Sequence, residues 1–152
     1  MGSGILKDGM EIRQITPTYA VSPQILPDDC QAIADAGFKT IICNRPDTEI
    51  TPDCCATAVE TAAKAAGLNF VTLPLTHQTM NSENVAAHRA AIDATDGPVL
   101  AYCASGTRSS IAWSLGQAGD IPCEEIIAAT TQAGYDLRGL QPQLEMIAAQ
   151  KG

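Results

Sequence analysis

One stretch decides the fold: Val99-Leu100-Ala101-Tyr102 is a short, continuous apolar run, and Cys103-Ala104-Ser105-Gly106-Thr107-Arg108-Ser109 follows it directly. An apolar run of this length predicts a strand that is buried on both faces, as in a parallel sheet. A helix is expected over roughly 108–118, so the cysteine lies where a strand ends and a helix is about to begin. Because parallel α/β folds bind ligands at the carboxyl ends of their strands, this junction is the candidate site.

The rest of the chain alternates strands and helices in the same way. Residues 11–21 predict an edge strand or a hairpin, interrupted by Pro17, and further strands are expected over 40–43 and 69–75. Helices are predicted from Pro27 to a stop at Gly37 and over 53–66, 82–94, 124–133 and 139–150. This alternation predicts one α/β domain in which helices flank a central, mostly parallel sheet of four or five strands.

Length and composition agree with one domain. At about 100–200 residues per domain, 152 residues form a single unit, expected over 5–152, and Met1-Gly2-Ser3-Gly4 reads as a cloning remnant outside the fold. Hydrophobic residues make up 45% and charged residues 17% of the chain, which excludes a disordered protein. The net charge of −8 argues against nucleic acid or an anionic membrane as the main partner. No apolar run approaches the roughly 18–20 residues that span a bilayer.

Six cysteines, most of them in apolar contexts, are expected to be reduced thiols, which favours a cytoplasmic protein. Cys54 and Cys55 are adjacent, whereas zinc sites use cysteines two to four residues apart or partner histidines. The sequence therefore predicts no metal site, and no cofactor is expected.

The loop after the buried run has the parts of an anion site with a nucleophile inside it. The backbone amides of residues 104–108 can form a nest that points at one centre, and the start of the next helix adds partial positive charge. Gly106 permits a backbone conformation that other residues resist, and Arg108 supplies a forked, permanent cation. Cys103 in such a cradle is expected to be largely thiolate at neutral pH, with Ser109 donating a hydrogen bond to its sulfur. The alternative is a buried structural cysteine that precedes an ordinary helix.

These residues also carry a family resemblance. The stretch from Tyr102 to Ser109 resembles the active loops of rhodanese sulfurtransferases and of protein tyrosine and dual-specificity phosphatases. The surrounding chain resembles the phosphatase-like domain of beta-lactamase hydrolase-like proteins, which is also found fused to persulfide dioxygenases. The matching pieces are Val21-Ser22-Pro23-Gln24, Asp28-Asp29, Ala36-Gly37-Phe38-Lys39-Thr40-Ile41-Ile42, Asn44-Arg45-Pro46-Asp47-Thr48-Glu49, Gly67-Leu68 and Gly97-Pro98-Val99-Leu100-Ala101-Tyr102-Cys103. The resemblance implies a dual-specificity-phosphatase-like fold, with Cys103 as nucleophile and Arg108 as the anion-binding residue.

Three departures from the phosphatase pattern favour sulfur chemistry. Four residues separate Cys103 from Arg108, whereas phosphatases of this fold have five. The shorter loop has fewer amides, which suits a persulfide sulfur better than a phosphoryl group. The loop 74–81 contains no Asp or Glu that could act as the general acid, which phosphatases carry about 30 residues before the cysteine. Tyr102 stands where such phosphatases generally carry His. We therefore expect a rhodanese-like sulfurtransferase that passes sulfane sulfur through a Cys103 persulfide.

The partners expected for that reaction are a small anionic donor, thiosulfate or a persulfide, and a thiol acceptor, with a functional link to a persulfide dioxygenase. Two alternatives stay open: a cysteine-dependent phosphatase with a phosphocysteine intermediate, and a persulfide sensor or binding module without turnover.

Secondary candidates lie in two other loops. Arg45 follows a strand end and could line the pocket as a second cation, oriented by Asp47, or could form an ordinary surface ion pair. His77 could reach the ligand from the facing loop, or it could be a solvated loop histidine.

Overall fold

The computed structural model describes residues 3–5 and 11–151, in which one six-stranded sheet has the strand order β1-β2-β3-β6-β4-β5. The strands are β1 (Ser3–Ile5), β2 (Glu11–Thr16), β3 (Tyr19–Ser22), β4 (Thr40–Cys43), β5 (Asn69–Thr72) and β6 (Val99–Tyr102). The last four run parallel to one another, whereas β1 pairs with β2, and β2 with β3, in antiparallel fashion. The expected α/β class with a mostly parallel sheet is confirmed.

The register of the central strands brings three chain segments to one edge of the sheet. β6 lies between β3 and β4, and its last residue, Tyr102, is level with Ser22 and Cys43. All four residues of β3, β4 and β6 are buried, as continuous apolar runs in a covered parallel sheet should be. Cys103 therefore leaves the sheet between the segments that follow β3 and β4.

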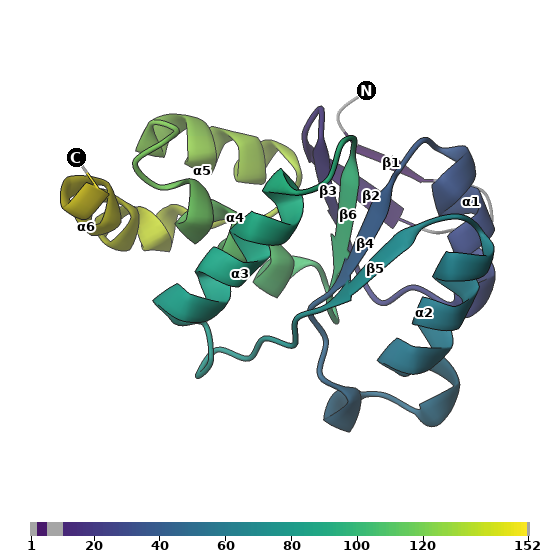
Figure 1. The fold of residues 1–152 in the computed structure, drawn as a ribbon. Helices are drawn as coiled ribbons and strands as arrows, with labels where there is room; N and C mark the ends of the chain where they lie inside the picture. The colour runs from purple at the N-terminus through teal and green to yellow at the C-terminus, as the bar shows by residue number, and fades with distance from the viewer. Residues whose placement is uncertain (1–2, 6–10, 152) are drawn as a thin grey trace.

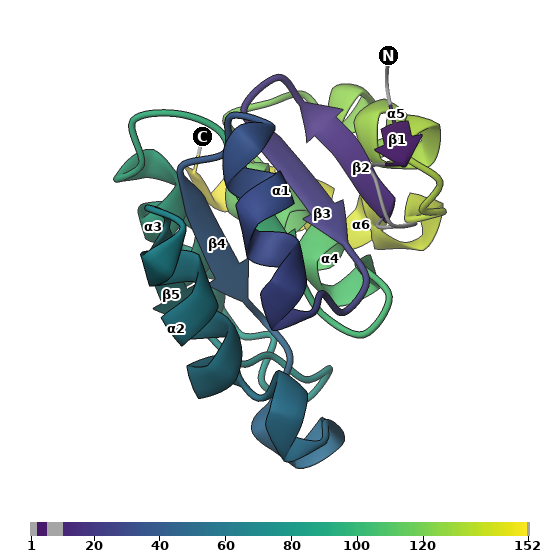
Figure 2. The ribbon, with the colours of Figure 1, turned by 90° about the vertical axis from the view of Figure 1, so that its right-hand side faces the viewer.

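Helices cover both faces of the sheet. Figures 1 and 2 show α1 (Cys30–Asp35) and α2 (Ala56–Ala65) on one side. On the other side lie α3 (Ser82–Asp93), α4 (Thr107–Gln117), α5 (Cys123–Gln132) and α6 (Gln141–Lys151). Short 3₁₀ turns lie at Pro27–Asp29, Asp47–Glu49, Pro52–Cys54 and Arg138–Leu140.

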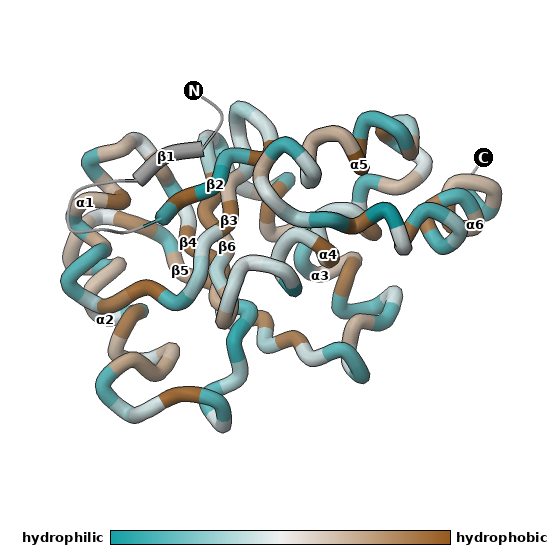
Figure 3. The backbone as a smooth tube through the Cα atoms, turned by 180° about the vertical axis from the view of Figure 1, so that it is seen from behind, coloured by the Kyte–Doolittle hydropathy of each residue, from teal (hydrophilic) through white to brown (hydrophobic). Residues whose placement is uncertain are grey.

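Alternating strand residues divide the interior into two cores. Ile41, Leu100 and Tyr102 face α1 and α2, whereas Ile42 and Ala101 face the helices on the other side. Seen from behind, brown, hydrophobic segments lie in the central strands and also in the helices and loops around them (Figure 3). Each face of the sheet therefore anchors its own helical layer.

Two expectations about the N-terminal part need correction. The sheet has six described strands rather than four or five, because the hairpin formed by β2 and β3 adds to the parallel strands and β1 extends it. Residues 3 and 4, expected to lie outside the fold, belong to β1. The hairpin itself is confirmed, but β3 is an inner strand because it pairs with β6 as well as with β2.

The predicted helices and the strand at 40–43 are found near their expected limits. The first helix ends before Gly37, whose φ of 101° is the left-handed conformation that favours glycine.

All six cysteines lie within residues 11–151, and none is in a disulfide. Across the described part of the chain, the helices are too short or too polar for any of them to traverse a lipid bilayer.

Candidate active site

Cys103 lies at the bottom of a tight loop between β6 and α4. Its side chain is fully buried, whereas the next two residues, Ala104 and Ser105, are exposed at the surface. The Gly106 N–H donates to Cys103 Sγ at 3.1 Å, so one loop amide points at the sulfur as expected. The Thr107 N–H instead donates to Ser105 Oγ at 3.4 Å. The loop holds the sulfur directly beneath its surface, with a backbone donor on it.

Gly106 and Tyr135 fix the shape of this loop. Gly106 is the residue before α4 and has a φ of 93°, in the left-handed region where a Cβ is unfavourable. A Cβ at this position would also collide with the hydroxyl of Tyr135. That hydroxyl donates to the Ser105 carbonyl at 2.9 Å, and Arg13 lies over the Tyr135 ring at 5.6 Å. Tyr135 therefore packs against the loop and fixes the position of the Ser105 carbonyl.

Arg108 forms a two-pronged ion pair with Glu49. Its guanidinium donates to the two carboxylate oxygens of Glu49 at 2.7 and 3.0 Å and to the Leu75 carbonyl at 2.7 Å. Arg45 Nε lies 3.7 Å from the same carboxylate, and Arg45 also donates to Gln24 Oε1 at 3.2 Å. We call Arg45, Glu49 and Arg108 the rim. In the rim, the Glu49 carboxylate accepts from both prongs of the Arg108 guanidinium, as a bound anion would.

The charge of Glu49 follows from these contacts. The hydrogen bond from Arg108 is the main cause that lowers the pKa of the Glu49 carboxyl, and the charges of Arg108 and Arg45 act in the same direction. The same pairing raises the pKa of Arg108. The rim therefore stays an ion pair at neutral pH, and Glu49 has no proton to donate.

Beneath the loop lies a closed set of buried polar side chains, which we call the ring: Tyr19, Asn44, His88 and Ser109. Ser109 Oγ donates to Asn44 Oδ1 at 2.8 Å, and Asn44 Nδ2 lies 3.3 Å from His88 Nδ1. His88 Nε2 lies 2.9 Å from Tyr19 Oη, which donates to the Ser109 carbonyl at 2.8 Å. All four residues are buried, so the ring joins β3, the end of β4, α3 and α4 in the interior.

The structure places the residues predicted for the site in three ways. Cys103, Gly106 and Arg108 share one loop, and Arg45 approaches it through Glu49. Asp47 does not orient Arg45, because its carboxylate accepts the Ala56 N–H at 2.9 Å and caps α2. The hydrogen bond expected from Ser109 to the sulfur is also not the one observed, since the hydroxyl donates to Asn44.

His77 is the remaining predicted residue, and it is exposed on the loop between β5 and α3. That loop does reach the site, but through the Leu75 carbonyl that accepts from Arg108. Tyr102, which precedes the cysteine, packs into the core beneath α1 and α2 rather than toward the loop.

Sequence reasoning missed five residues of this arrangement: Glu49, Tyr135, Tyr19, Asn44 and His88. Glu49 had a usable signal, because a half-buried arginine beside a strand end needs an acceptor in the same segment. The other four lie on separate elements, and no spacing in the chain links them. Within residues 3–5 and 11–151, no cluster of three or more His, Cys, Asp or Glu could hold a metal ion.

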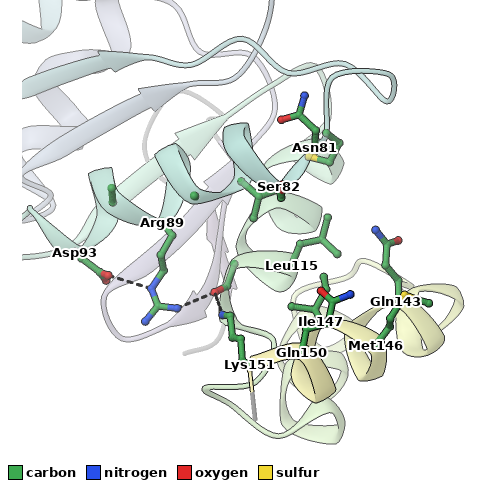
Figure 4. A pocket seen from close by; sticks show the side chains of 15 residues that line it. Asn81, Ser82, Arg89, Asp93, Leu115, Gln143, Met146, Ile147, Gln150 and Lys151 are labelled. Carbon is green, nitrogen blue, oxygen red and sulfur yellow. Dashed lines mark hydrogen bonds and ion pairs between the residues drawn. The ribbon is translucent and has the colours of Figure 1, made fainter.

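A cavity lies away from Cys103. A cavity of about 630 Å³ is bounded by α3, α4 and α6, with Leu115 and Ile147 in its wall (Figure 4). At one end, Arg89 binds Asp93 at 3.0 Å and Asp120 at 2.7 Å. No residue of the Cys103 loop lines this cavity, so it is separate from the candidate active site.

Fold and loop together define a class: a phosphatase-like α/β domain with a cysteine at the end of its central strand. A structure from Neisseria meningitidis, described as a candidate phosphatase, is 33% identical, with a TM-score of 0.78 over 94% of this chain and 97% of that one. TpbA from P. aeruginosa, in a cysteine-to-serine variant in complex with pTyr, has a TM-score of 0.60 at 15% identity and covers 97% of this chain and 95% of its own. At that identity the second likeness concerns the fold alone.

The family follows from the sequence comparison. Residues 11–120 match the model of the phosphatase-like domain of beta-lactamase hydrolase-like proteins, and the chain belongs to this family. A beta-lactamase hydrolase-like protein of Xylella fastidiosa is 32% identical over 143 residues, which is 93% of this chain and 33% of that protein. One from Agrobacterium fabrum is 30% identical over 142 residues, or 92% and 33%. The chain thus spans about a third of the length of these relatives.

Proposed function

We propose that this domain is a cysteine-dependent phosphatase in which Cys103 is the nucleophile. The observation that carries the proposal is the loop itself, where the Gly106 N–H donates to the Cys103 sulfur and Arg108 lies in the first turn of the following helix. The phosphatase-like family and its solved neighbours favour this reaction over the sulfur transfer expected from the sequence alone.

In the proposed reaction, the Cys103 thiolate attacks phosphorus and a thiol-phosphate bond forms while the bond to the ester oxygen breaks. The Arg108 fork binds two phosphoryl oxygens, for which it must exchange Glu49 for the substrate. Water then attacks the phosphocysteine, which releases inorganic phosphate and returns the thiolate.

The site narrows the substrates that such a phosphatase can use. The carboxylate closest to Arg108 belongs to Glu49, whose lowered pKa keeps it ionised, and residues 74–81 include no Asp or Glu. Without a general acid, rates fall by roughly 10²–10⁴ for leaving groups that need a proton. We therefore propose phosphomonoesters of acidic alcohols, such as aryl phosphates, as the substrate class.

The test is hydrolysis of a series of aryl phosphates by the intact chain. Nitrophenyl phosphate should be cleaved, Cys103→Ser should abolish the activity, and the rate should fall steeply as the leaving phenol becomes less acidic. Cys123→Ser, a change of the same kind on a half-exposed cysteine of α5, is the matched control and should leave the rate unchanged. Retention of activity in Cys103→Ser would refute the proposal.

Sulfur transfer is the second candidate, favoured by the shortened loop and by the missing proton donor. Cys103 would attack the outer sulfur of thiosulfate, break the sulfur–sulfur bond and release sulfite, which needs no protonation. An acceptor thiolate, or cyanide, would then take the outer sulfur from the Cys103 persulfide. Thiocyanate formation from thiosulfate and cyanide, without hydrolysis of any aryl phosphate, would establish this candidate instead. A persulfide that forms on Cys103 and is never passed on would indicate a sensor.

A further inference from the structure

We propose that Tyr135 is a positioning residue: its hydroxyl sets the orientation of one peptide of the Cys103 loop, and thereby the donor that the loop presents to the sulfur and to a bound anion. The role toward the anion rests on the proposed function, whereas the orientation of the peptide does not depend on turnover.

Two hydrogen bonds of the loop belong to a single peptide group. The Ser105 carbonyl accepts from the Tyr135 hydroxyl at 2.9 Å, and the Gly106 N–H donates to Cys103 Sγ at 3.1 Å. This carbonyl and this N–H are the two ends of the peptide that joins residues 105 and 106. Because a trans peptide is planar, its C=O and its N–H point in opposite directions. The hydroxyl and the sulfur therefore hold the same peptide from opposite sides.

Gly106 does not fix this orientation by itself. Its φ is 93°, and glycine adopts positive and negative φ about equally readily. Rotation of the peptide would turn the Ser105 carbonyl toward the sulfur and the Gly106 N–H away from it, and a glycine backbone permits both states. What the glycine supplies is room, since a Cβ at this position would collide with the Tyr135 hydroxyl. The choice between the two orientations then falls to that hydroxyl.

The neighbouring amides make this one peptide important. The Thr107 N–H donates to Ser105 Oγ at 3.4 Å, and the Cys103 N–H donates to the Ser22 carbonyl at 3.4 Å. Among the hydrogen bonds of the described residues, the one that reaches Cys103 Sγ comes from Gly106. A reversed peptide would remove a donor that favours negative charge and would turn the negative end of a carbonyl toward the thiolate and toward any anion bound beside it.

Tyr135 is fixed in place by contacts of its own. Its side chain is buried, and the guanidinium of Arg13 lies over its ring at 5.6 Å. Arg13 in turn donates to the Ala133 carbonyl at 2.8 Å, which ties β2 to the segment that carries Tyr135. Burial raises the pKa of the Tyr135 hydroxyl to about 12, so the group keeps its proton and remains a donor at neutral pH. The hydroxyl can therefore hold the Ser105 carbonyl outward under all conditions in which the loop would bind an anion.

The experiment measures hydrogen exchange of the Gly106 amide in the intact chain by NMR. Tyr135→Phe removes the hydroxyl and leaves an aromatic ring beneath Arg13. Loss of this hydrogen bond should raise the population of the reversed peptide, and exchange of the Gly106 amide should become about three- to ten-fold faster. The affinity for inorganic phosphate, measured by protection of Cys103 from iodoacetamide, should fall by a similar factor.

Added phosphate gives a readout that a merely structural role would not move. An anion binds the peptide whose N–H points inward, so it should shift the population back toward that orientation. In Tyr135→Phe, saturating phosphate should therefore slow the exchange of the Gly106 amide to about the rate of the unmodified chain with phosphate.

Tyr102→Phe is the matched control. It removes the same atom from a buried tyrosine that directly precedes Cys103, and within residues 3–5 and 11–151 the Tyr102 hydroxyl has no hydrogen-bond partner. Exchange of the Gly106 amide and the affinity for phosphate should both stay within about two-fold of the unmodified chain. The amides in the middle of α4 serve as an internal reference and should keep their exchange rates in both variants.

Three results would overturn the role of Tyr135: an unchanged rate for the Gly106 amide in Tyr135→Phe, an equal acceleration in Tyr102→Phe, or an equal acceleration throughout α4. The last would show a loosened loop and helix rather than the rotation of one peptide. Faster exchange of the Gly106 amide with an unchanged affinity for phosphate would overturn the role toward the anion. If exchange responds as expected and the chain cleaves no aryl phosphate, the proposed function fails and the role of Tyr135 toward the sulfur stands.

Discussion

The ring and the rim both hold the first turn of α4, directly after the Cys103 loop, but they are built by opposite means. The ring is neutral and fully buried, and its hydrogen bonds are directional and mutually satisfied. The rim is charged, and the side chain of Glu49 is 35% exposed. A partly exposed ion pair contributes only about 0–1 kcal/mol and can exchange partners, whereas a buried polar group that loses its partner costs about 1–3 kcal/mol. The ring is therefore suited to hold geometry, and the rim to release one anion for another.

The most severe way to break the rim is Arg108→Lys, which keeps the charge and removes the fork. A lysine cannot form the two parallel bonds that Arg108 makes to a carboxylate or a phosphoryl group. We expect kcat/KM for an aryl phosphate to fall by roughly 10²–10³-fold, the usual effect of removing a donor from a developing negative charge.

Arg45→Lys is the matched comparison, because Arg45 Nε lies 3.7 Å from the Glu49 carboxylate and Arg45 Nη2 donates to the Glu49 backbone carbonyl at 2.9 Å. Its effect should be smaller by at least an order of magnitude. Equal losses in the two variants would mean that the fork of Arg108 has no special role in the rim.

The ring is tested by lowering the pH, because its contribution to the free energy of unfolding depends on a neutral His88. The pKa of His88 is about 4 in the folded chain, against an ordinary value of 6.5. Between these values the unfolded chain binds the extra proton and the folded chain does not, so the free energy of unfolding falls as pH falls from 6.5 toward 4. The expected loss from this group between pH 7 and pH 5 is about 2 kcal/mol, measurable by urea unfolding at the two pH values.

His88→Asn removes the titrating group, and the difference between the two pH values should shrink by most of that amount. The same substitution at His77, exposed on its loop, controls for the mere loss of a histidine. If the unmodified chain and His88→Asn lose the same stability between pH 7 and pH 5, then the ring does not depend on a neutral imidazole.

The loop and the two arginines of the rim were visible in the sequence, whereas Glu49 and most of the ring were not. A buried run that ends at Cys103, with Gly106 and Arg108 following, is local information, and local spacing predicted the strand, the turn and the helix correctly. The predicted count of strands was lower because β1 is only three residues long and gains its place by pairing with β2. Such pairing depends on a tertiary neighbour and leaves no period in the chain.

Three of the four ring residues, Tyr19, Asn44 and His88, could not be found for a related reason. Tyr19 and His88 are 69 residues apart, and each reads as an ordinary residue of its own element. The buried state of His88 follows from the packing of α3 on the sheet, which no local pattern reports. Asp47 illustrates the reverse error, because nearness in sequence to Arg45 suggested a pair, whereas the carboxylate is closer in space to the start of α2.

The mildest change that sharpens the comparison is Glu49→Gln. If Glu49 competes with the substrate for Arg108, loss of its charge should tighten the binding of inorganic phosphate by about two- to five-fold, in line with the small worth of an exposed ion pair. Because Arg108 lowers the pKa of the Glu49 carboxyl, the pair persists at neutral pH and is lost only as pH falls through that lowered pKa. The difference in phosphate affinity between the variant and the unmodified chain should therefore vanish in acid.

Inhibition of Cys103 alkylation by phosphate measures the affinity, and Glu60→Gln, which removes a similar surface pair with Lys64, is the control. Weaker phosphate binding in Glu49→Gln would show the opposite role, with the carboxylate holding Arg108 in place for the anion rather than competing with it.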